Sequence, residues 1–129
     1  MPVPTPRPTT PHPPAEAPPA AVVEIHGPDG WFAVCPLSRL LPGRGVAVLL
    51  PDGGQAALFV DRAGRPYALG NRDPFTGAHV LSRGLTGSSD GRPFVASPLL
   101  KQRFDLVSGV CIDDPDVSVP AYRVRTREG

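Results

Sequence analysis

Residues 46–61 read VAVLLPDGGQAALFVD, and this stretch decides the fold class of the chain. Two short apolar runs, 46–50 and 55–61, flank the turn sequence Pro-Asp-Gly-Gly. Apolar runs of this length on either side of a glycine-containing turn are typical of a β-hairpin. The sequence therefore predicts two paired strands at the centre of the chain.

The same alternation of short runs and turns continues on both sides of this hairpin. Nineteen prolines and 14 glycines interrupt the 129 residues too often for long helices. We expect one helical turn in residues 36–41 and further strands at 31–35, 66–69, 93–97, 102–106 and 121–126. Several short strands at close spacing predict an all-β fold, a small antiparallel sandwich or barrel with one long loop.

The chain divides into two segments of different composition. Residues 1–21 are proline-rich and have few apolar side chains to bury, which predicts a disordered tail. Its PxxP motif at residues 8–11 could bind a proline-recognising module, although such a motif is almost unavoidable in this composition. Residues 22–129 are expected to form the single folded domain.

Charge and apolar patterning exclude two kinds of partner. The net charge is +1, from 13 basic and 12 acidic residues, which gives no electrostatic reason for nucleic-acid binding. No apolar segment is long enough to span a membrane, and the N-terminus lacks the apolar stretch of a signal peptide. We therefore expect a cytoplasmic protein with neither a nucleic-acid nor a membrane partner, and with both cysteines reduced.

No local motif indicates catalysis or metal binding. No two of the histidines and cysteines lie within four residues of each other: His12, His26, His79, Cys35 and Cys111. The chain has no Gly-x-Ser-x-Gly elbow and no phosphate-binding glycine motif. The acidic run at 113–116 matches no calcium loop and indicates a solvated turn. No catalytic, cofactor-binding or metal-binding residue is predicted.

Two segments carry a resemblance to a known family of domains. Residues 71–84, NRDPFTGAHVLSRG, and 96–106, ASPLLKQRFDL, resemble the two cluster-binding loops of a Rieske domain. Those loops carry Cys-x-His and Cys-Pro-x-His, the second followed by an aromatic and an acidic residue. Here Ser97-Pro98 and Phe104-Asp105 keep the frame of the second loop.

The four ligand positions of this frame hold other residues. Asp73 and Phe75 occupy the first pair of positions, and Ser97 and Leu100 occupy the second pair. A Rieske centre needs two thiolates and two imidazoles, and hard oxygen donors are poor substitutes for thiolate. The sequence therefore predicts a Rieske-like domain without its cluster.

Over roughly residues 31–126 the chain resembles the small subunit of the cytoplasmic NAD(P)H-dependent assimilatory nitrite reductase. The resemblance implies an accessory subunit that contributes no redox centre to nitrate assimilation. Its partner would be a large catalytic subunit that carries FAD, an iron–sulfur cluster and sirohaem, and that reduces nitrite to ammonia. The proline-rich tail lies outside the family pattern.

Two alternatives stay open: a free-standing Rieske-like binding module and a ferredoxin-like component of an oxygenase. For the subunit interpretation, the two loops are the expected docking surface. Phe75 and Leu100 would form its apolar centre, with basic residues around them: Arg72, Arg83, Lys101 and Arg103. Phe75 and Leu100 could instead fill the space that a cluster would occupy.

Overall fold

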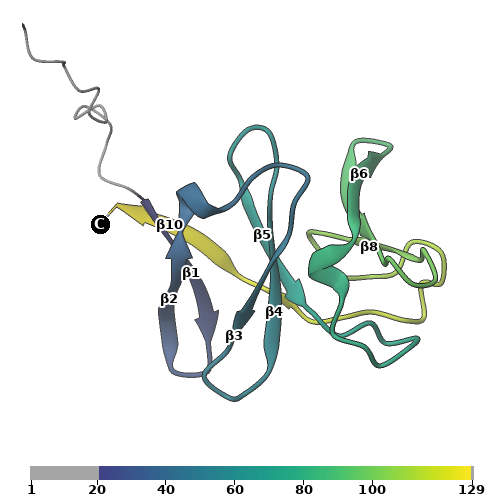
Figure 1. The fold of residues 1–129 in the computed structure, drawn as a ribbon, viewed down its shortest axis with the longest axis horizontal. Coiled ribbons are helices and arrows are strands. Elements are labelled where there is room, and N and C mark those ends of the chain that lie inside the picture. The colour runs from purple at the N-terminus through teal and green to yellow at the C-terminus, as the bar shows by residue number, and fades with distance from the viewer. Residues whose placement is uncertain (1–20, 129) are drawn as a thin grey trace, which may run out of the picture.

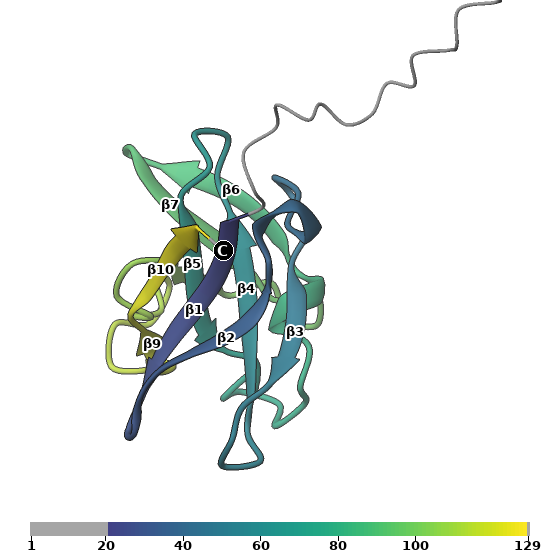
Figure 2. The same ribbon diagram turned by 90° about the vertical axis from the view of Figure 1, so that its left-hand side faces the viewer.

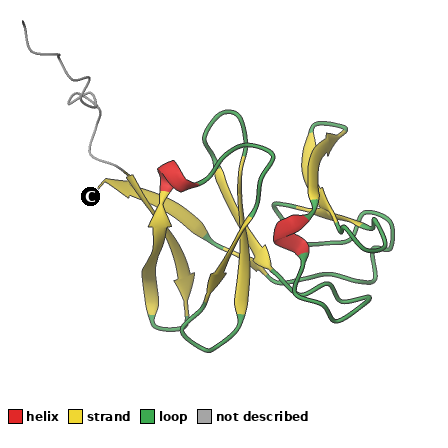
Figure 3. Cartoon of the chain, viewed as in Figure 1, coloured by secondary structure: helices red, strands yellow, loops and turns green. Residues whose placement is uncertain are grey.

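The computed structural model describes residues 21–128, which form a β structure with two short 3₁₀ turns (Figures 1 and 3). The strands are β1 (Ala21–Gly27), β2 (Gly30–Pro36), β3 (Val46–Leu49), β4 (Gln55–Val60), β5 (Pro66–Gly70), β6 (Leu85–Ser89), β7 (Arg92–Ala96), β8 (Arg103–Asp105), β9 (Ala121–Tyr122) and β10 (Val124–Glu128). The turns are η1 (Leu37–Arg39) and η2 (Leu81–Arg83). The all-β prediction is confirmed. The tail predicted for residues 1–21 lies, except for Ala21, outside the described residues.

The strands form three antiparallel sheets, ordered β10-β1-β2, β3-β4-β5-β9 and β6-β7-β8. Figure 1 shows the third sheet on the right, beside the loops that follow β8, while the first two sheets stand together on the left. In Figure 2 the sheet that contains β1 lies in front of the sheet that contains β4. We call the third sheet and its surrounding loops, residues 71–119, the lobe.

Strand β4 is buried on both faces, which explains its continuous apolar sequence QAALFV. Ala57 and Phe59 point into a core cluster shared with the lobe, where they join Phe104 and Leu69 among others. The alternate residues of β4 point into a second cluster with Val23, Ile25 and their neighbours on β1. The central strand therefore connects the lobe rigidly to the rest of the fold.

The predicted hairpin is confirmed, since β3 pairs with β4 in the register Val46 to Leu58 through Leu49 to Gln55. Three details differ from the prediction. Residues 121–126 form two strands in different sheets, β9 and β10, with a break at Arg123. The sequence pattern predicts no strand at Ala21–Gly27, where the structure has β1. The long aperiodic stretch after residue 71 contains η2 and β6. The sequence of β6, LTGSS, has no run of β-branched residues that would predict a strand.

Within residues 21–128, no helix has the length and apolar character needed to cross a membrane.

Candidate functional site

The two segments that resemble cluster-binding loops lie in contact in the lobe. The first loop, residues 71–80, follows β5, and the second loop, residues 97–102, follows β7. The Ser97 hydroxyl donates a hydrogen bond of 2.5 Å to Oδ2 of Asp73, and both residues are buried. A short hydrogen bond from a hydroxyl to a carboxylate is among the stronger kinds. The two residues at the former thiolate positions thus bind each other directly.

Asp73 also organises the first loop. Its Oδ1 accepts the backbone N–H of Phe75 at 2.8 Å, and its own N–H donates to the carbonyl of Ala78 at 2.8 Å. Its carbonyl accepts the N–H of Gly77 at 2.7 Å, and Gly77 has φ +82°, a conformation that glycine adopts at little cost. Asp73 therefore fixes the turn of the first loop through its backbone and its carboxylate, and the carboxylate joins this loop to the second loop.

The residues at the former histidine positions lie in different environments. Phe75 is half-buried and packs on the core cluster, with its ring centroid 6.2 Å from that of Phe104. Leu100 is 53% exposed. Phe75 therefore contributes mainly to the interior, whereas Leu100 contributes to the surface of the lobe.

The four basic residues around the loops are not equivalent. Arg103 is held by Asp113 through its backbone N–H, Nε and Nη2, the last at 2.8 Å from Oδ1. Its guanidinium also lies 5.6 Å from the ring centroid of Phe94. Arg72, Arg83 and Lys101 are exposed and form no ion pair among the described residues.

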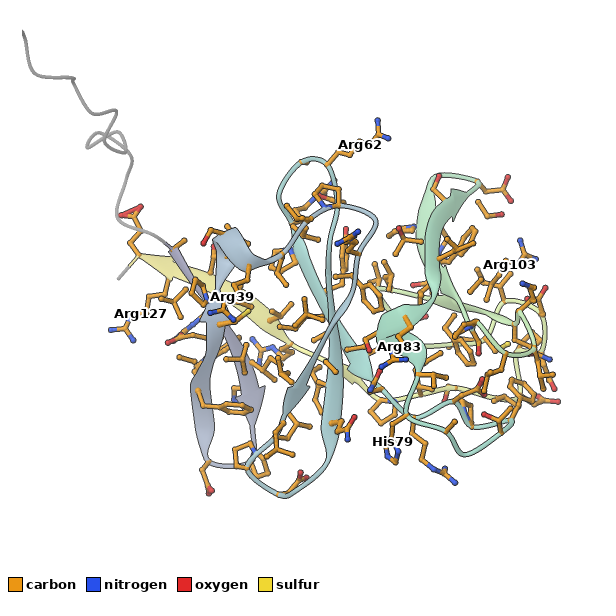
Figure 4. All side chains as sticks on the ribbon, in the orientation of Figure 1. Arg39, Arg62, His79, Arg83, Arg103 and Arg127 are labelled. Carbon is orange, nitrogen blue, oxygen red and sulfur yellow. The ribbon has the colours of Figure 1, made fainter. Side chains whose placement is uncertain are left out.

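Arg83 and Arg103 lie on different sides of the lobe. Figure 4 shows Arg83 on the η2 side of the lobe and Arg103 on its outer side, beside the last loops. Lys101 has φ +67°, a left-handed conformation that is unfavourable for a residue with a Cβ. Lys101 is thus the candidate docking residue that is both exposed and held in a strained backbone conformation.

Asp105, the acidic residue that follows the second loop, has a structural role. Its Oδ1 accepts the N–H groups of Val107 and Ser108, and its Oδ2 accepts Nε of Arg92 at 2.6 Å. Burial alone would raise the pKa of Asp105, but these hydrogen bonds and the charge of Arg92 bring the pKa below its ordinary value. The carboxylate therefore stays ionised and stabilises the turn that follows β8.

The residues present do not fit a [2Fe–2S] cluster. Within residues 21–128, no three His, Cys, Asp or Glu side chains are close enough to hold a metal ion. Asp73 and Ser97 already satisfy each other, and Phe75 and Leu100 have no ligand atoms. A Rieske iron pair requires thiolate and imidazole at these four positions.

Comparison with known proteins places this geometry in a family. A family model described as a Rieske-like [2Fe-2S] domain matches residues 30–129. The nitrite reductase (NADH) small subunit of Salmonella typhimurium is 44% identical over 105 residues, covering 77% of this chain and 92% of that protein. The chain belongs to the family of Rieske-like nitrite reductase small subunits.

Two further relatives of this small-subunit family inform its function. A crystal structure of a provisionally named NADH-dependent nitrite reductase small subunit from Mycobacterium tuberculosis is 50% identical, with a TM-score of 0.70. That match covers 81% of this chain and 86% of the other. A nitrite reductase [NAD(P)H] large subunit of Klebsiella oxytoca is 41% identical over 100 residues, covering 77% of this chain but 10% of that protein.

The relatives favour the small-subunit interpretation over the binding module and the oxygenase component. The description of the family model includes a [2Fe-2S] cluster. This member has no residue that could supply a thiolate or an imidazole at the four cluster-ligand positions. The Rieske-like small-subunit fold is therefore present with a hydrogen bond and a phenylalanine where the cluster ligands would lie.

The two cysteines of the chain are not among the four residues at the cluster-ligand positions. Cys111 is fully buried in the core cluster of the lobe, and Cys35 is half-buried beside the second cluster. Both are free thiols. Burial raises the pKa of Cys35, and the charge of Arg39 offsets part of this. A thiol with a raised pKa is a poor nucleophile, which indicates a packing role for Cys35. The full burial of Cys111 among apolar side chains indicates a packing role for it as well.

Changing Cys111 to alanine is expected to lower the free energy of unfolding by about 1–3 kcal/mol, because it opens a small cavity in the core. Cys35→Ala should cost less, since that side chain is only half-buried. Denaturant unfolding of both variants measures the difference. A Cys111→Ser variant that folds but abolishes turnover of the assembled reductase would instead show a chemical role.

Proposed function

We propose that the chain is the accessory small subunit of a cytoplasmic NAD(P)H-dependent nitrite reductase that serves nitrate assimilation. The large catalytic subunit would hold FAD, an iron–sulfur cluster and sirohaem and would reduce nitrite to ammonia. The small subunit would add no redox centre. The observation that carries this proposal is the 44% identity over 105 residues with a nitrite reductase (NADH) small subunit. The buried Asp73–Ser97 hydrogen bond supports the absence of a redox centre.

The Klebsiella relative supports the choice of partner. The matching segment makes up 10% of a protein named as a nitrite reductase large subunit, so the domain also occurs within the chain of its proposed partner. Two domains linked in one chain meet at high effective concentration. As a separate chain, the same domain needs a binding surface that replaces the covalent connection.

We propose that the lobe provides that surface. Most of the large apolar side chains that are exposed in residues 21–128 lie on it: Leu85, Leu99, Leu100, Val107 and Val110. Such residues, together with nearby basic side chains, have the composition of a protein interface. Strained backbone tends to persist where a residue has a function, and Lys101 has φ +67° beside Leu100. Lys101 and Leu100 are therefore proposed as its centre.

Reconstitution tests the proposed function. A complex of this chain with the large subunit is expected to reduce nitrite with NADH or NADPH, and the isolated chain is expected to reduce none. The complex should contain the same amount of iron per large subunit as the large subunit alone. Failure of the two chains to associate under any salt condition would contradict the proposal.

Lys101→Glu is expected to weaken association with the large subunit about tenfold, which corresponds to about 1.4 kcal/mol. Lys101→Gly should weaken association as well, yet raise the stability of the isolated domain by up to about 1 kcal/mol, because glycine adopts the left-handed conformation without strain. Binding assays and thermal unfolding measure the two effects separately.

Arg62→Glu is the matched control. Arg62 is exposed in the turn between β4 and β5, away from the lobe loops in Figure 4. The Arg62→Glu variant changes the net charge by the same amount as Lys101→Glu. Arg103 is unsuitable as a test residue, because its replacement would also release Asp113. Equal affinity of the Lys101→Glu and Arg62→Glu variants would show that the partner docks elsewhere.

A further inference from the structure

A second site lies at the opposite part of the molecule from the lobe. The turn that joins β1 to β2, at the lower left of Figure 1, borders a pocket of about 260 Å³. Its walls are largely apolar, and they include the aromatic side chains of Trp31, Phe32 and Tyr122 and the rings of Pro28 and Pro51. The pocket is slightly smaller than the roughly 300–1,000 Å³ of sites for small organic ligands. Its size therefore suits a few side chains of a peptide.

The central tryptophan of this pocket is held in place on several sides. The His26 ring packs edge-on against Trp31, with centroids 5.1 Å apart at 76°. The Arg125 guanidinium lies 4.1 Å from the Trp31 ring centroid, and Glu24 accepts Nε of Arg125 at 2.8 Å. A wall that is already fixed loses little conformational entropy when it binds a ligand. The pocket is thus prepared for an occupant.

The pocket also has two carboxylates in its walls, while the Arg123 guanidinium lies 5.7 Å from the Trp31 ring centroid. Asp29 and Asp52 are among its lining residues, whereas no lysine or arginine is. Neither carboxylate forms an ion pair among the described residues, and Asp52 accepts only the N–H of Gly54 at 2.8 Å. Burial, together with the charge of Asp52, raises the pKa of the Tyr122 hydroxyl. The matching occupant is therefore apolar, rich in rings and positively charged at one end.

One segment of the chain itself has this chemistry. Residues 1–20 contain nine prolines and one arginine, and residues 7–11 read Arg-Pro-Thr-Thr-Pro. Proline-rich segments bind to aromatic grooves because little conformational entropy is lost, and an adjacent arginine pairs with acidic residues of the groove. We propose that residues 7–11 bind in this pocket of the same chain, with the proline rings against Trp31 and Tyr122 and with Arg7 paired to Asp29 or Asp52.

The chain length allows this contact. Strand β1 runs from Ala21 to Gly27, so the pocket lies about 20 Å from the point where the described residues begin. The ten residue-to-residue steps from Pro11 to Ala21 would span about 31 Å if extended as polyproline II, which exceeds that distance. Because the segment is tethered, its effective concentration is in the millimolar range, and a weak contact suffices.

Trp31 is the single tryptophan of the chain, so its fluorescence reports on the pocket directly. In the full chain, Pro8→Ala combined with Pro11→Ala is expected to shift the Trp31 emission to longer wavelength and to increase quenching by acrylamide. Pro18→Ala combined with Pro19→Ala is the matched control and should leave both unchanged. Arg7→Asp should shift the emission as the Pro8/Pro11 variant does. Combining Arg7→Asp with Asp29→Arg or with Asp52→Arg should restore the wild-type emission.

Three other outcomes would overturn the proposal. Identical emission in the wild type and the Pro8/Pro11 variant would show that the segment does not reach Trp31. An equal shift in the Pro18/Pro19 control would show a general effect of composition. Emission that depends on protein concentration, with dimers seen by light scattering, would assign the pocket to a second copy of the chain. None of these measurements needs the large subunit, so the result is independent of the proposed function.

Discussion

Asp73→Ala is expected to lower the free energy of unfolding by about 2–4 kcal/mol, the largest loss of stability that we expect from one polar residue of the lobe. The change removes the bond to Ser97 and the bond to the N–H of Phe75, and it leaves a buried hydroxyl and a partly buried N–H without their partner. Urea unfolding monitored by the single tryptophan measures the loss.

A double-mutant cycle separates the contribution of the Asp73–Ser97 bond from that of the loop turn. Ser97→Ala, Asp73→Ala and the double variant should give a coupling energy of at least about 1 kcal/mol, because the two groups bind each other at 2.5 Å. Asp116→Asn is the control, since Asp116 is exposed. Additive single-variant effects would mean that the two loops are not joined through this bond.

The sequence predicted the parts of the fold that local pattern determines. The β3–β4 hairpin was found because a glycine turn separates two apolar runs, and η1 because proline residues bracket a short apolar segment. Strand β6 was missed because it has one β-branched residue, Thr86, among glycine and serine residues that do not favour strands. It is held by pairing with β7, from Leu85 opposite Ala96 to Ser89 opposite Arg92. Such tertiary pairing overrides local propensity.

The sequence indicated which two loops resemble cluster-binding loops, but it did not predict the contacts between them. The spacing of Asp73, Phe75, Ser97 and Leu100 identified the loops through a resemblance, yet no local rule brings Ser97 to within 2.5 Å of a residue 24 positions earlier. Likewise, Asp113 is exposed, as expected for a solvated turn, but its ion pair with Arg103 on the neighbouring segment was not predicted. The pocket beside Trp31 could not be predicted, because its walls come from three separate segments of the chain.

We expect the wild-type chain to remain colourless and free of iron even after anaerobic incubation with iron and sulfide. Its two oxygen donors at the former thiolate positions are paired with each other, and its other two positions carry hydrocarbon side chains. Elemental analysis and a visible spectrum measure the result. Stoichiometric iron with red-brown absorption would contradict the interpretation of the loops.

The same treatment of a variant with all four ligands restored is expected to give the opposite result. The variant combines Asp73→Cys, Phe75→His, Ser97→Cys and Leu100→His. The side chains at 73 and 97 already contact each other, and Leu100 is exposed enough for an imidazole to turn inward. This variant should bind a [2Fe–2S] cluster with about two irons per chain. A control that keeps Ser97 supplies only three ligands and should bind far less iron. If both variants fold but remain colourless, then packing around Phe104, and not the missing ligands alone, prevents cluster binding.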